Sequence, residues 1–438
     1  MPEPSPLGSS RGVSPVEVAA SVALGTWAEP LSALGEALPP TLAEVRVVEG
    51  LLLPNLHANA SLSPAPHIVV RMQGQTPQVL LHHGGTDTVL PALWLRARSP
   101  DPSQRDTITG QRLMNPHLLP DDLSLVDARM DASGLQLAFS DGFRGAFDPA
   151  ELMAGSVLDD ACPPPVPWMA DLSPQPWYGW DALADDTVLH RALHDYIARG
   201  FLLIHGTSTE PDAILSIARR FGFVRETNFG AFFEVYSRPD STDLAYRPVA
   251  LGPHTDNPYR SPVPGIQLLH CLQNQTSGGL STLVDSLAVA RQLQQEDPAG
   301  FALLASVPVR YEYRDADTSL VAVQPMIELT GKGAMMGVFY SPRLDDMPLM
   351  SEPDTQAYHR ARKRFGTLLS DPRFELRFRL EPGQLMMFDN NRVLHGRTAF
   401  DPSEGHRQLQ GCYIDRDGPR SRYRVLSRHR VAQPGRPR

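Results

Sequence analysis

Residues 66–155 show a clear alternation of hydrophobic and polar positions. Four short runs there alternate in this way and end at Gly or Asp: HIVVRMQG, QVLLHHGG, LQLAFSDG and RGAFD. A period of two is typical of strands with one buried face, and Gly or Asp at the ends favours turns. We therefore predict a small β-rich domain over these residues.

Residues 181–430 combine helical and strand patterns. Helices are expected at DDTVLHRALHDYIARG, EPDAILSIARRFG, SLAVARQLQQED and DTQAYHRARKRFGTLLSD. Strands are expected at FLLIHG, GIQLLHCL, STLVD, VRYEY, QPMIEL, MMGVFY, FELRFRL, QLMMFD, RVLHG and QLQGCYI. Many short strands with a few helices outside them are typical of a jelly-roll barrel of two facing sheets. We predict a mainly β domain with flanking helices (α+β).

Two further segments lie outside these domains. Residues 1–65 are rich in Pro, Ala, Ser and Leu, and we expect an N-terminal extension without chemistry of its own. Residues 156–180 contain ACPPPVPWMADLSPQPWYGW, whose prolines predict an extended, stiff linker. Its tryptophans, Trp168, Trp177 and Trp180, are expected to pack the linker against the next domain.

Composition narrows the class of protein. The chain of 438 residues is long enough for two or three domains, and its net charge of −9 provides no basic field for nucleic acid. No apolar run approaches the length of a membrane span, and the N-terminus has neither a secretory nor a mitochondrial pattern. We expect a cytoplasmic protein with neither a nucleic-acid nor a membrane partner.

The three cysteines are Cys162, Cys271 and Cys412. They are too scattered for a disulfide framework or a CxxC metal site, so we expect reduced thiols. Cys271 and Cys412 lie in apolar runs with strand character, where a small buried side chain is expected.

Candidate chemistry centres on GPHTDNPYR and on FDNNRVLHGR, about 140 residues downstream. His254 and Asp256 are two positions apart, so on an extended segment they point to the same face. With His395 from a distant strand they would form the facial triad of a non-haem Fe(II) oxygenase, which leaves metal positions open for O2 and a chelating co-substrate. The alternative is a turn histidine with a capping aspartate.

Arg407 follows His395 by twelve residues, in HGRTAFDPSEGHRQLQG. An arginine binds a carboxylate bidentately and keeps its charge, which suits the far carboxylate of 2-oxoglutarate. The alternative is a surface ion pair. An H-x-D tripeptide alone is weak, but the joint pattern with His395 and Arg407 is specific.

Four long motifs carry a family resemblance: HTDNPYRSPVPGIQLLHCL, GGLSTLVDS, FDNNRVLHGR and RQLQGCYIDRDGPRSRYRVL. They resemble the gamma-butyrobetaine dioxygenase and trimethyllysine dioxygenase branch of the 2-oxoglutarate oxygenases, over roughly residues 66–430. The resemblance implies a double-stranded β-helix with Fe(II) inside, 2-oxoglutarate and O2 as co-substrates, and a homodimer. It also places Ser281 where the family has a hydroxyl near the carboxylate that Arg407 would bind.

The family also carries a zinc ion in its N-terminal domain, bound by three cysteines and a histidine. Here the matching segment RARSPDPSQRD has no cysteine and SDGFRGAF has no histidine. Because zinc needs thiolate or imidazole ligands, we expect no zinc. His82 and His83 are adjacent on a strand and point to opposite faces, so we interpret them as surface or turn histidines.

A trimethylammonium group is bound by aromatic faces through cation–π attraction. The segment NFGAFFEVYSRPDSTDLAY matches the family segment that supplies this cage. The resemblance implies Phe229, Phe233 and Tyr246 as cage residues, with Tyr259 nearby. The alternative is that they are ordinary core aromatics.

The chain departs from butyrobetaine enzymes where those typically have Asn, with Asp243 in one segment and Tyr340 and Ser341 in another. Arg343 or Arg260 could instead meet a phosphonate or a carboxylate.

We expect a dioxygenase that hydroxylates a C–H bond of a small quaternary-ammonium substrate of the gamma-butyrobetaine type. The alternatives are 2-trimethylaminoethylphosphonate, trimethyllysine or another small amine. A hypothesis of another class is a non-catalytic β-sandwich binding module. Asp389 and Asn390 are expected to fix a loop, and His270 and His406 are not expected to be ligands.

Overall fold

The computed structural model of the chain describes residues 67–156, 161–236 and 248–431. The expectations for residues 1–65, for Asp243 and for Tyr246 lie outside these described residues.

The first described part consists of two antiparallel three-stranded meanders. One is formed by β1 (His67–Gln73), β2 (Thr76–His83) and β3 (Thr86–Val89), and the other by β4 (Leu125–Asp131), β5 (Gly134–Phe139) and β6 (Arg144–Phe147). Two helices, α1 (Ala92–Arg96) and α2 (Pro149–Ser156), accompany them. Alternate residues such as Val79, Leu137 and Phe147 fill one core, as the period of two predicted. β3 and β4 were not predicted: β3 contains one apolar residue, Val89, and in β4 the adjacent Leu125 and Val126 break the alternation.

A buried arginine joins the two segments that lack the zinc ligands of the family. Arg96 is 6% exposed. Its Nε donates to Oδ2 of Asp141 at 2.8 Å, and its Nη1 donates to Oε1 of Gln104 at 2.6 Å. The guanidinium carbon also lies 4.0 Å from the centroid of the Phe143 ring. The guanidinium therefore holds together the RARSPDPSQRD and SDGFRGAF segments, while the absence of zinc stays a prediction.

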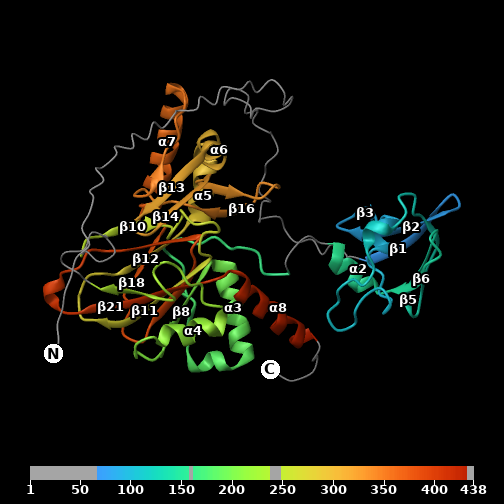
Figure 1. Cartoon of the computed structure of the whole chain (residues 1–438), viewed down its shortest axis with the longest axis horizontal. Helices are drawn as coiled ribbons and strands as arrows, with labels where there is room; N and C mark the ends of the chain where they lie inside the picture. Colours follow the sequence, from blue (N-terminus) through green and yellow to red (C-terminus); the bar gives the residue numbers. More distant parts are fainter. Residues whose placement is uncertain (1–66, 157–160, 237–247, 432–438) are drawn as a thin grey trace, which may run out of the picture. The chain divides into compact units, whose positions relative to one another are not determined.

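The second described part is built on a six-stranded sheet with the order β7-β8-β19-β11-β21-β9. Its strands are β7 (Trp177–Gly179), β8 (Phe201–His205), β19 (Leu385–Asp389), β11 (Ile266–Asn274), β21 (Arg407–Ile414) and β9 (Phe233–Tyr236). Only β7 and β8 pair in parallel in this sheet. Helices α3 (Asp186–Arg199), α4 (Ala213–Phe221) and α8 (Asp417–Val431) pack on one face through residues such as Leu193, Ile217 and Leu426 (Figure 1).

A four-stranded sheet faces the other side of the first sheet. Its order is β10-β20-β12-β18, with β10 (Leu251–His254), β20 (Val393–Arg397), β12 (Ser281–Asp285) and β18 (Glu375–Phe378). Alternation separates the layers: Leu203 packs between the two sheets, whereas Leu202 packs against the helices. In the described strands the two sheets have separate hydrogen-bonding networks, so the jelly roll is two facing sheets.

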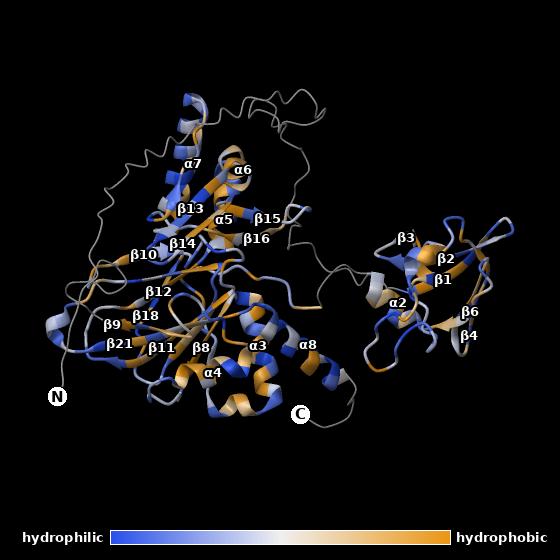
Figure 2. Cartoon of the chain, viewed as in Figure 1, coloured by the Kyte–Doolittle hydropathy of each residue, from blue (hydrophilic) through white to orange (hydrophobic). Residues whose placement is uncertain are grey.

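A third layer covers the outer face of the four-stranded sheet. It contains α5 (Ser286–Glu296), α6 (Pro298–Ser306), α7 (Glu352–Leu369), β13 (Pro308–Arg314), β14 (Ser319–Pro325), β15 (Ile327–Leu329), β16 (Met335–Val338) and β17 (Asp345–Asp346). Helix α6 is mostly hydrophobic, whereas α7 is mostly hydrophilic (Figure 2). The predicted fold class, a jelly roll with flanking helices plus a small β-rich part, is confirmed.

The end of the expected linker is a strand of the main sheet, since Trp177–Gly179 forms β7. The expected packing of the linker tryptophans is confirmed for Trp168, whose ring lies 5.0 Å from that of Phe201. Trp177 and Trp180 also pack against cores of this part. Helices α6 and α8 were not predicted.

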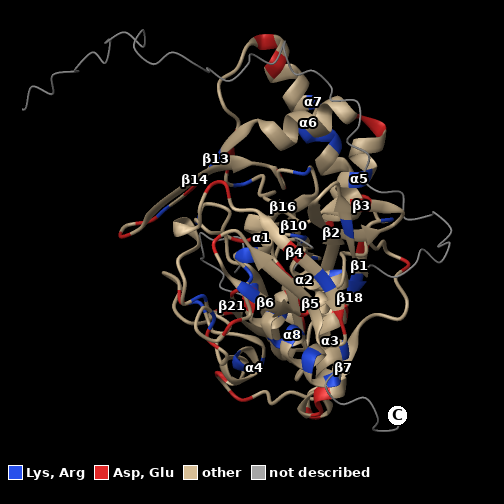
Figure 3. Ribbon diagram, turned by 90° about the vertical axis from the view of Figure 1, so that its right-hand side faces the viewer, with Lys and Arg blue, Asp and Glu red and all other residues tan. Residues whose placement is uncertain are grey.

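Acidic and basic residues are interspersed over the described elements (Figure 3). Of the helices that the structure describes, none combines the length and the apolar character needed to cross a membrane.

Candidate active site

The two histidines of the candidate triad lie on neighbouring strands. β10 pairs with β20 so that His254 is directly opposite His395. Asp256 follows two residues after His254, and Asp256 Oδ1 lies 3.2 Å from His254 Nε2 and 4.0 Å from His395 Nε2. Thus His395 is distant in sequence but adjacent in the sheet. Within the described residues these three form the one cluster of His, Cys, Asp and Glu that could hold a metal ion, with ligand atoms within 4.8 Å of one another.

Each side of Asp256 is held by a hydrogen bond. Tyr413 Oη donates to Asp256 Oδ2 at 2.8 Å, which leaves Oδ1 for the histidines. Asn390 Oδ1 accepts from the backbone N–H of Asp256 at 2.9 Å, and Asn390 Nδ2 donates to the backbone oxygens of Asp256 and Pro264. The expectation that Asn390 fixes the loop is therefore confirmed.

His254 is oriented by the backbone. Its Nδ1 lies 3.0 Å from the carbonyl oxygen of Gly252. A carbonyl can only accept, so Nδ1 carries the proton and Nε2 is free to face a metal. Thr255, between the two candidate ligands, points the other way and donates from Oγ1 to the Val338 carbonyl at 2.8 Å.

The electrostatics of the triad favour the forms that bind a metal. Burial and the neighbouring His254 lower the pKa of His395 to about 3, so its imidazole is neutral. Burial raises the pKa of Asp256, but His395 and the hydrogen bond with His254 outweigh burial and hold that pKa well below its usual range. A neutral imidazole and an ionised carboxylate are the ligand forms that a divalent metal requires.

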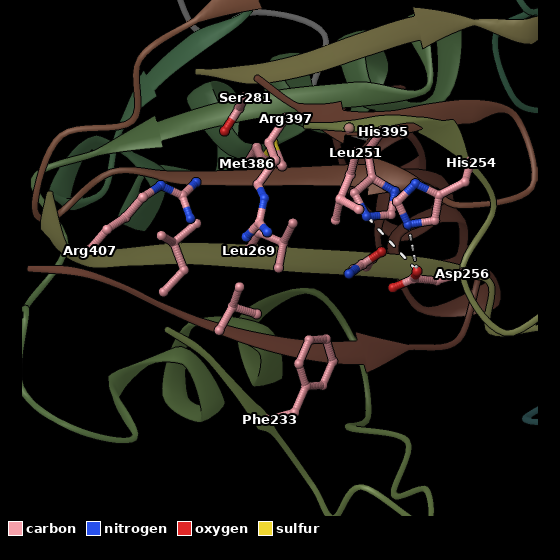
Figure 4. A pocket seen from close by; sticks show the side chains of 14 residues that line it. Phe233, Leu251, His254, Asp256, Leu269, Ser281, Met386, His395, Arg397 and Arg407 are labelled. Atoms are coloured by element: carbon pink, nitrogen blue, oxygen red, sulfur yellow. Dashed lines mark ion pairs between the residues drawn. The ribbon is translucent and has the colours of Figure 1, made fainter. Parts of the chain in front are cut away.

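A pocket between the two sheets runs from the triad to Arg407 (Figure 4). Arg407 begins β21, is 7% exposed, and donates from Nη2 to the Gly279 carbonyl at 3.2 Å. No carboxylate among the described residues forms an ion pair with it, and burial lowers its pKa. Ser281 of β12 is buried and lines the same pocket. The pocket therefore offers a buried cation and a hydroxyl to an anion.

Gly279 makes room for that cation. A Cβ at this position would lie 2.7 Å from Arg407 Nε, and its φ of +65° is left-handed. The glycine therefore serves both the turn and the close approach of Arg407.

The expected cage residues fall into two aromatic groups. Phe233 lines the pocket, and its ring lies 5.4 Å from that of Tyr413. Phe229 and Tyr259 instead meet Tyr313 of β13, with ring centroids 5.8 Å and 5.0 Å away. The structure thus brings Phe229 and Tyr259 together, but around a tyrosine that was not predicted.

Asn257 stands between the two groups. Its Oδ1 accepts from Tyr259 Oη at 2.5 Å. The pKa of Tyr413 is raised far above its usual range by burial and by Asp256. Tyr413 therefore remains a neutral donor to Asp256.

The remaining candidates have structural partners. Asp389 accepts from Arg416 at 2.8 Å, as expected of a residue that fixes a loop. His270 is buried against Thr207 Oγ1 at 2.9 Å, away from the triad cluster, and burial lowers its pKa to about 4. Cys271 and Cys412 are fully buried, as expected. His82 pairs with Asp87 on β2 and β3.

Sequence reasoning missed Tyr413, Arg397 and Tyr313. Alternation could have found the first two, because Arg397 is two residues after His395 and Tyr413 is six after Arg407. Tyr313 comes from a separate sheet, and no local pattern signals it.

Comparison with known proteins gives consistent matches. Residues 173–413 match the family described as Taurine catabolism dioxygenase TauD, TfdA family. The chain is 37% identical over 348 residues to a gamma-butyrobetaine dioxygenase of Pseudomonas sp. (strain AK-1), covering 77% of this chain and 90% of that protein. It is 28% identical over 350 residues to the mitochondrial trimethyllysine dioxygenase of Rattus norvegicus, covering 77% and 82% respectively. A human gamma-butyrobetaine dioxygenase is 32% identical over 256 residues, covering 57% of this chain and 66% of that protein.

Proposed function

Since this chain belongs to the TauD, TfdA family of dioxygenases, we propose that it hydroxylates a C–H bond of a small quaternary-ammonium substrate of the gamma-butyrobetaine type. It is an Fe(II)- and 2-oxoglutarate-dependent dioxygenase, and O2 is its second co-substrate. The observation that carries the proposal is the convergence of His254, Asp256 and His395 at one end of a pocket that has a buried arginine at the other.

The donor set fits Fe(II). Two neutral imidazoles and one carboxylate on one side of a metal suit non-haem iron and leave positions open for co-substrates. Tyr413 restrains Asp256 through Oδ2, so the carboxylate would bind through Oδ1. We assign His254, Asp256 and His395 as the iron ligands.

The end of the pocket that lies opposite the triad fits the far carboxylate of 2-oxoglutarate. A buried guanidinium without a carboxylate partner among the described residues is costly unless an anion pairs with it. We assign Arg407 to that carboxylate, with the Ser281 hydroxyl as a further donor. The apolar walls, including Leu269 and Leu409, exclude water from the co-substrate.

When bound, iron with 2-oxoglutarate and O2 supplies the oxidising power that breaks the substrate C–H bond. The chain contributes position and shielding. Asn390 and Tyr413 hold the Asp256 carboxylate, the Gly252 carbonyl keeps the His254 tautomer, and Arg407 fixes the far end of the co-substrate.

Aromatic groups near the triad support a quaternary-ammonium substrate. Phe233 lines the pocket and packs against Tyr413, which donates to Asp256, and Phe229, Tyr259 and Tyr313 form the second group. A trimethylammonium cation has no hydrogen-bond donor and is bound by such faces. Tyr246, which lies outside the described residues, stays a proposed member of the cage.

Three polar groups favour 2-trimethylaminoethylphosphonate as a second candidate substrate. The side chains of Asn257 and Ser341 are buried, and Asn257 Nδ2 and Ser341 Oγ have no hydrogen-bond partner in the described part of the chain. After burial and His254, the positive charge of Arg343 also lowers the pKa of His395, so Arg343 is within electrostatic range of the triad. Donors and a cation suit an acidic end, and a phosphonate offers more charge and acceptors than a carboxylate.

Succinate formation tests the proposal. Protein reconstituted with Fe(II) without oxygen is exposed to air with 2-oxoglutarate and one amine: gamma-butyrobetaine, the phosphonate or trimethyllysine. We expect one amine to stimulate succinate formation, and Asp256→Ala to abolish it. If the phosphonate is the substrate, Arg343→Met should impair its turnover more than that of gamma-butyrobetaine. Succinate that is indifferent to every amine would reject the quaternary-ammonium assignment, and none at all would favour the binding module.

The location of the protein, its oligomeric state and its division into domains are also proposals. We propose that the protein is cytoplasmic, as its composition suggests, and that it is a homodimer, as the family resemblance implies. A monomer mass from light scattering during size-exclusion chromatography would contradict the homodimer. We also propose the division into residues 1–65, 66–155, 156–180 and 181–430, which limited proteolysis would test.

A further inference from the structure

A second arginine enters the pocket between the triad and Arg407. Arg397 is two residues after His395 on β20, so both side chains project from the same face of the strand. It is 8% exposed and lines the same pocket. Figure 4 shows its guanidinium between Arg407 and the triad. Along the strand, the backbone of Arg397 is two residues, about 7 Å, from that of His395, a candidate metal ligand.

The sheet holds Arg397 firmly in this place. Arg397 is opposite Leu251 of β10 on one side and Ser281 of β12 on the other. The preceding Gly396 is packed closely, because a Cβ there would lie 2.5 Å from the Leu251 carbonyl oxygen and 2.8 Å from Thr282 Oγ1. The strand path that presents His395 to a metal therefore also presents Arg397 to the pocket.

Both arginines lie close to the same aromatic ring, that of Phe400. The guanidinium carbons of Arg397 and Arg407 lie 5.3 Å and 5.4 Å from the centroid of Phe400, which is itself buried. Cation–π attraction to a shared ring orients both groups. Two guanidiniums in one buried pocket create a field that favours a dianion over a monoanion. 2-Oxoglutarate is such a dianion, with a carboxylate at each end.

We propose that Arg397 binds the keto-acid end of 2-oxoglutarate, the end that chelates iron, while Arg407 binds the far carboxylate. This rests on the proposed function of the pocket. Arg397 stands nearer to the triad along β20, whereas Arg407 enters from β21 at the far end (Figure 4). Each of the two arginines thus binds one carboxylate of the co-substrate.

A pair of ligands separates the two roles. 2-Oxovalerate has the keto acid of 2-oxoglutarate but lacks the far carboxylate. Both acids are titrated into oxygen-free protein loaded with Fe(II), and the charge-transfer absorbance of the chelate reports binding without turnover. We expect Arg397→Met to weaken both acids by the same factor, at least about 30-fold. The matched variant Arg407→Met should weaken 2-oxoglutarate and leave 2-oxovalerate unchanged.

Two results would overturn the proposal. If Arg397→Met weakened only 2-oxoglutarate, Arg397 would serve the far carboxylate. If it weakened neither acid, its role would be structural. Should Arg397→Met fail to fold, Arg397→Lys retains the stem and charge without the bidentate fork, and we expect a smaller loss that is again equal for both acids. Failure of the unmodified protein to bind either acid would contradict the proposed function itself.

Discussion

Tyr413 donates from its hydroxyl to Oδ2 of Asp256 at 2.8 Å, while the other oxygen of that carboxylate, Oδ1, faces His254 and His395. A carboxylate held in this way presents one oxygen in a fixed direction. Removal of a side chain that hydrogen-bonds to a metal ligand typically lowers metal affinity by a factor of about 10 to 100.

We therefore expect Tyr413→Phe to weaken Fe(II) binding by about 10- to 100-fold, measured by titration without oxygen. The ring against Phe233 is kept, so the loss reports the hydroxyl. Tyr178→Phe is a matched control, because the Tyr178 hydroxyl donates to Asp195 and lies outside the pocket. Equal iron affinities of Tyr413→Phe and the unmodified protein would show that the hydrogen bond does not orient the ligand.

Most strands of the two facing sheets could be predicted because their apolar runs are strong and local. The short strands β7, β9 and β10 were not predicted, because three or four residues show no clear alternation. The i, i+2 relation of His254 and Asp256 also followed from strand geometry. Register could not be predicted in this way. That His254 is opposite His395, and that Tyr413 reaches Asp256, depends on how distant strands align.

Helix α8 shows a different reason for a missed element. Its sequence DGPRSRYRVLSRHRV is mostly polar, and Leu426 is its fully buried apolar residue in the described core. Its packing depends on contacts with α3: the ring of Tyr423 on α8 stacks on the ring of His190 on α3, with 4.7 Å between the ring centroids. Such tertiary contacts have no signature in the local pattern.

Arg96 should be essential for the stability of the small β-rich part. Arg96→Met leaves Asp141 without its partner in a part-buried site, and we expect a loss of about 3 kcal/mol in the free energy of unfolding. Arg129→Met is a control, since the Arg129 side chain is 70% exposed. Urea unfolding measures both variants, and a chelator should leave the unfolding midpoint of the unmodified protein unchanged. A midpoint lowered by the chelator would indicate a structural metal there.

The buried pair of Arg392 and Asp285 ties the linker to the sheets. Arg392 donates to both oxygens of Asp285 and to the carbonyls of Ala198 and Val166, and the backbone of Trp168 donates to Asp285. Removing one charge leaves the other buried and unpaired.

We expect Arg392→Met and Asp285→Leu each to cost about 3–5 kcal/mol of unfolding free energy. The double variant should cost clearly less than the two losses added together, because neither charge is then left alone. Denaturant unfolding of all four proteins gives the coupling. Additive losses would mean that the ion pair itself contributes nothing and that packing accounts for the effect.

Tyr313 tests whether the second aromatic group binds the substrate cation. Its ring contacts both Phe229 and Tyr259, and Phe229 is 37% exposed, so the group is open to a ligand. A cation–π contact contributes about 0.5–2 kcal/mol. We therefore expect Tyr313→Ala to raise the KM for the quaternary amine by about 2- to 30-fold. Tyr313→Phe keeps the ring and should change the KM little. A neutral analogue with a tert-butyl group in place of the trimethylammonium group separates charge from shape: if Tyr313→Ala impaired both ligands by the same factor, the tyrosine would support the fold of the pocket and would not bind the cation.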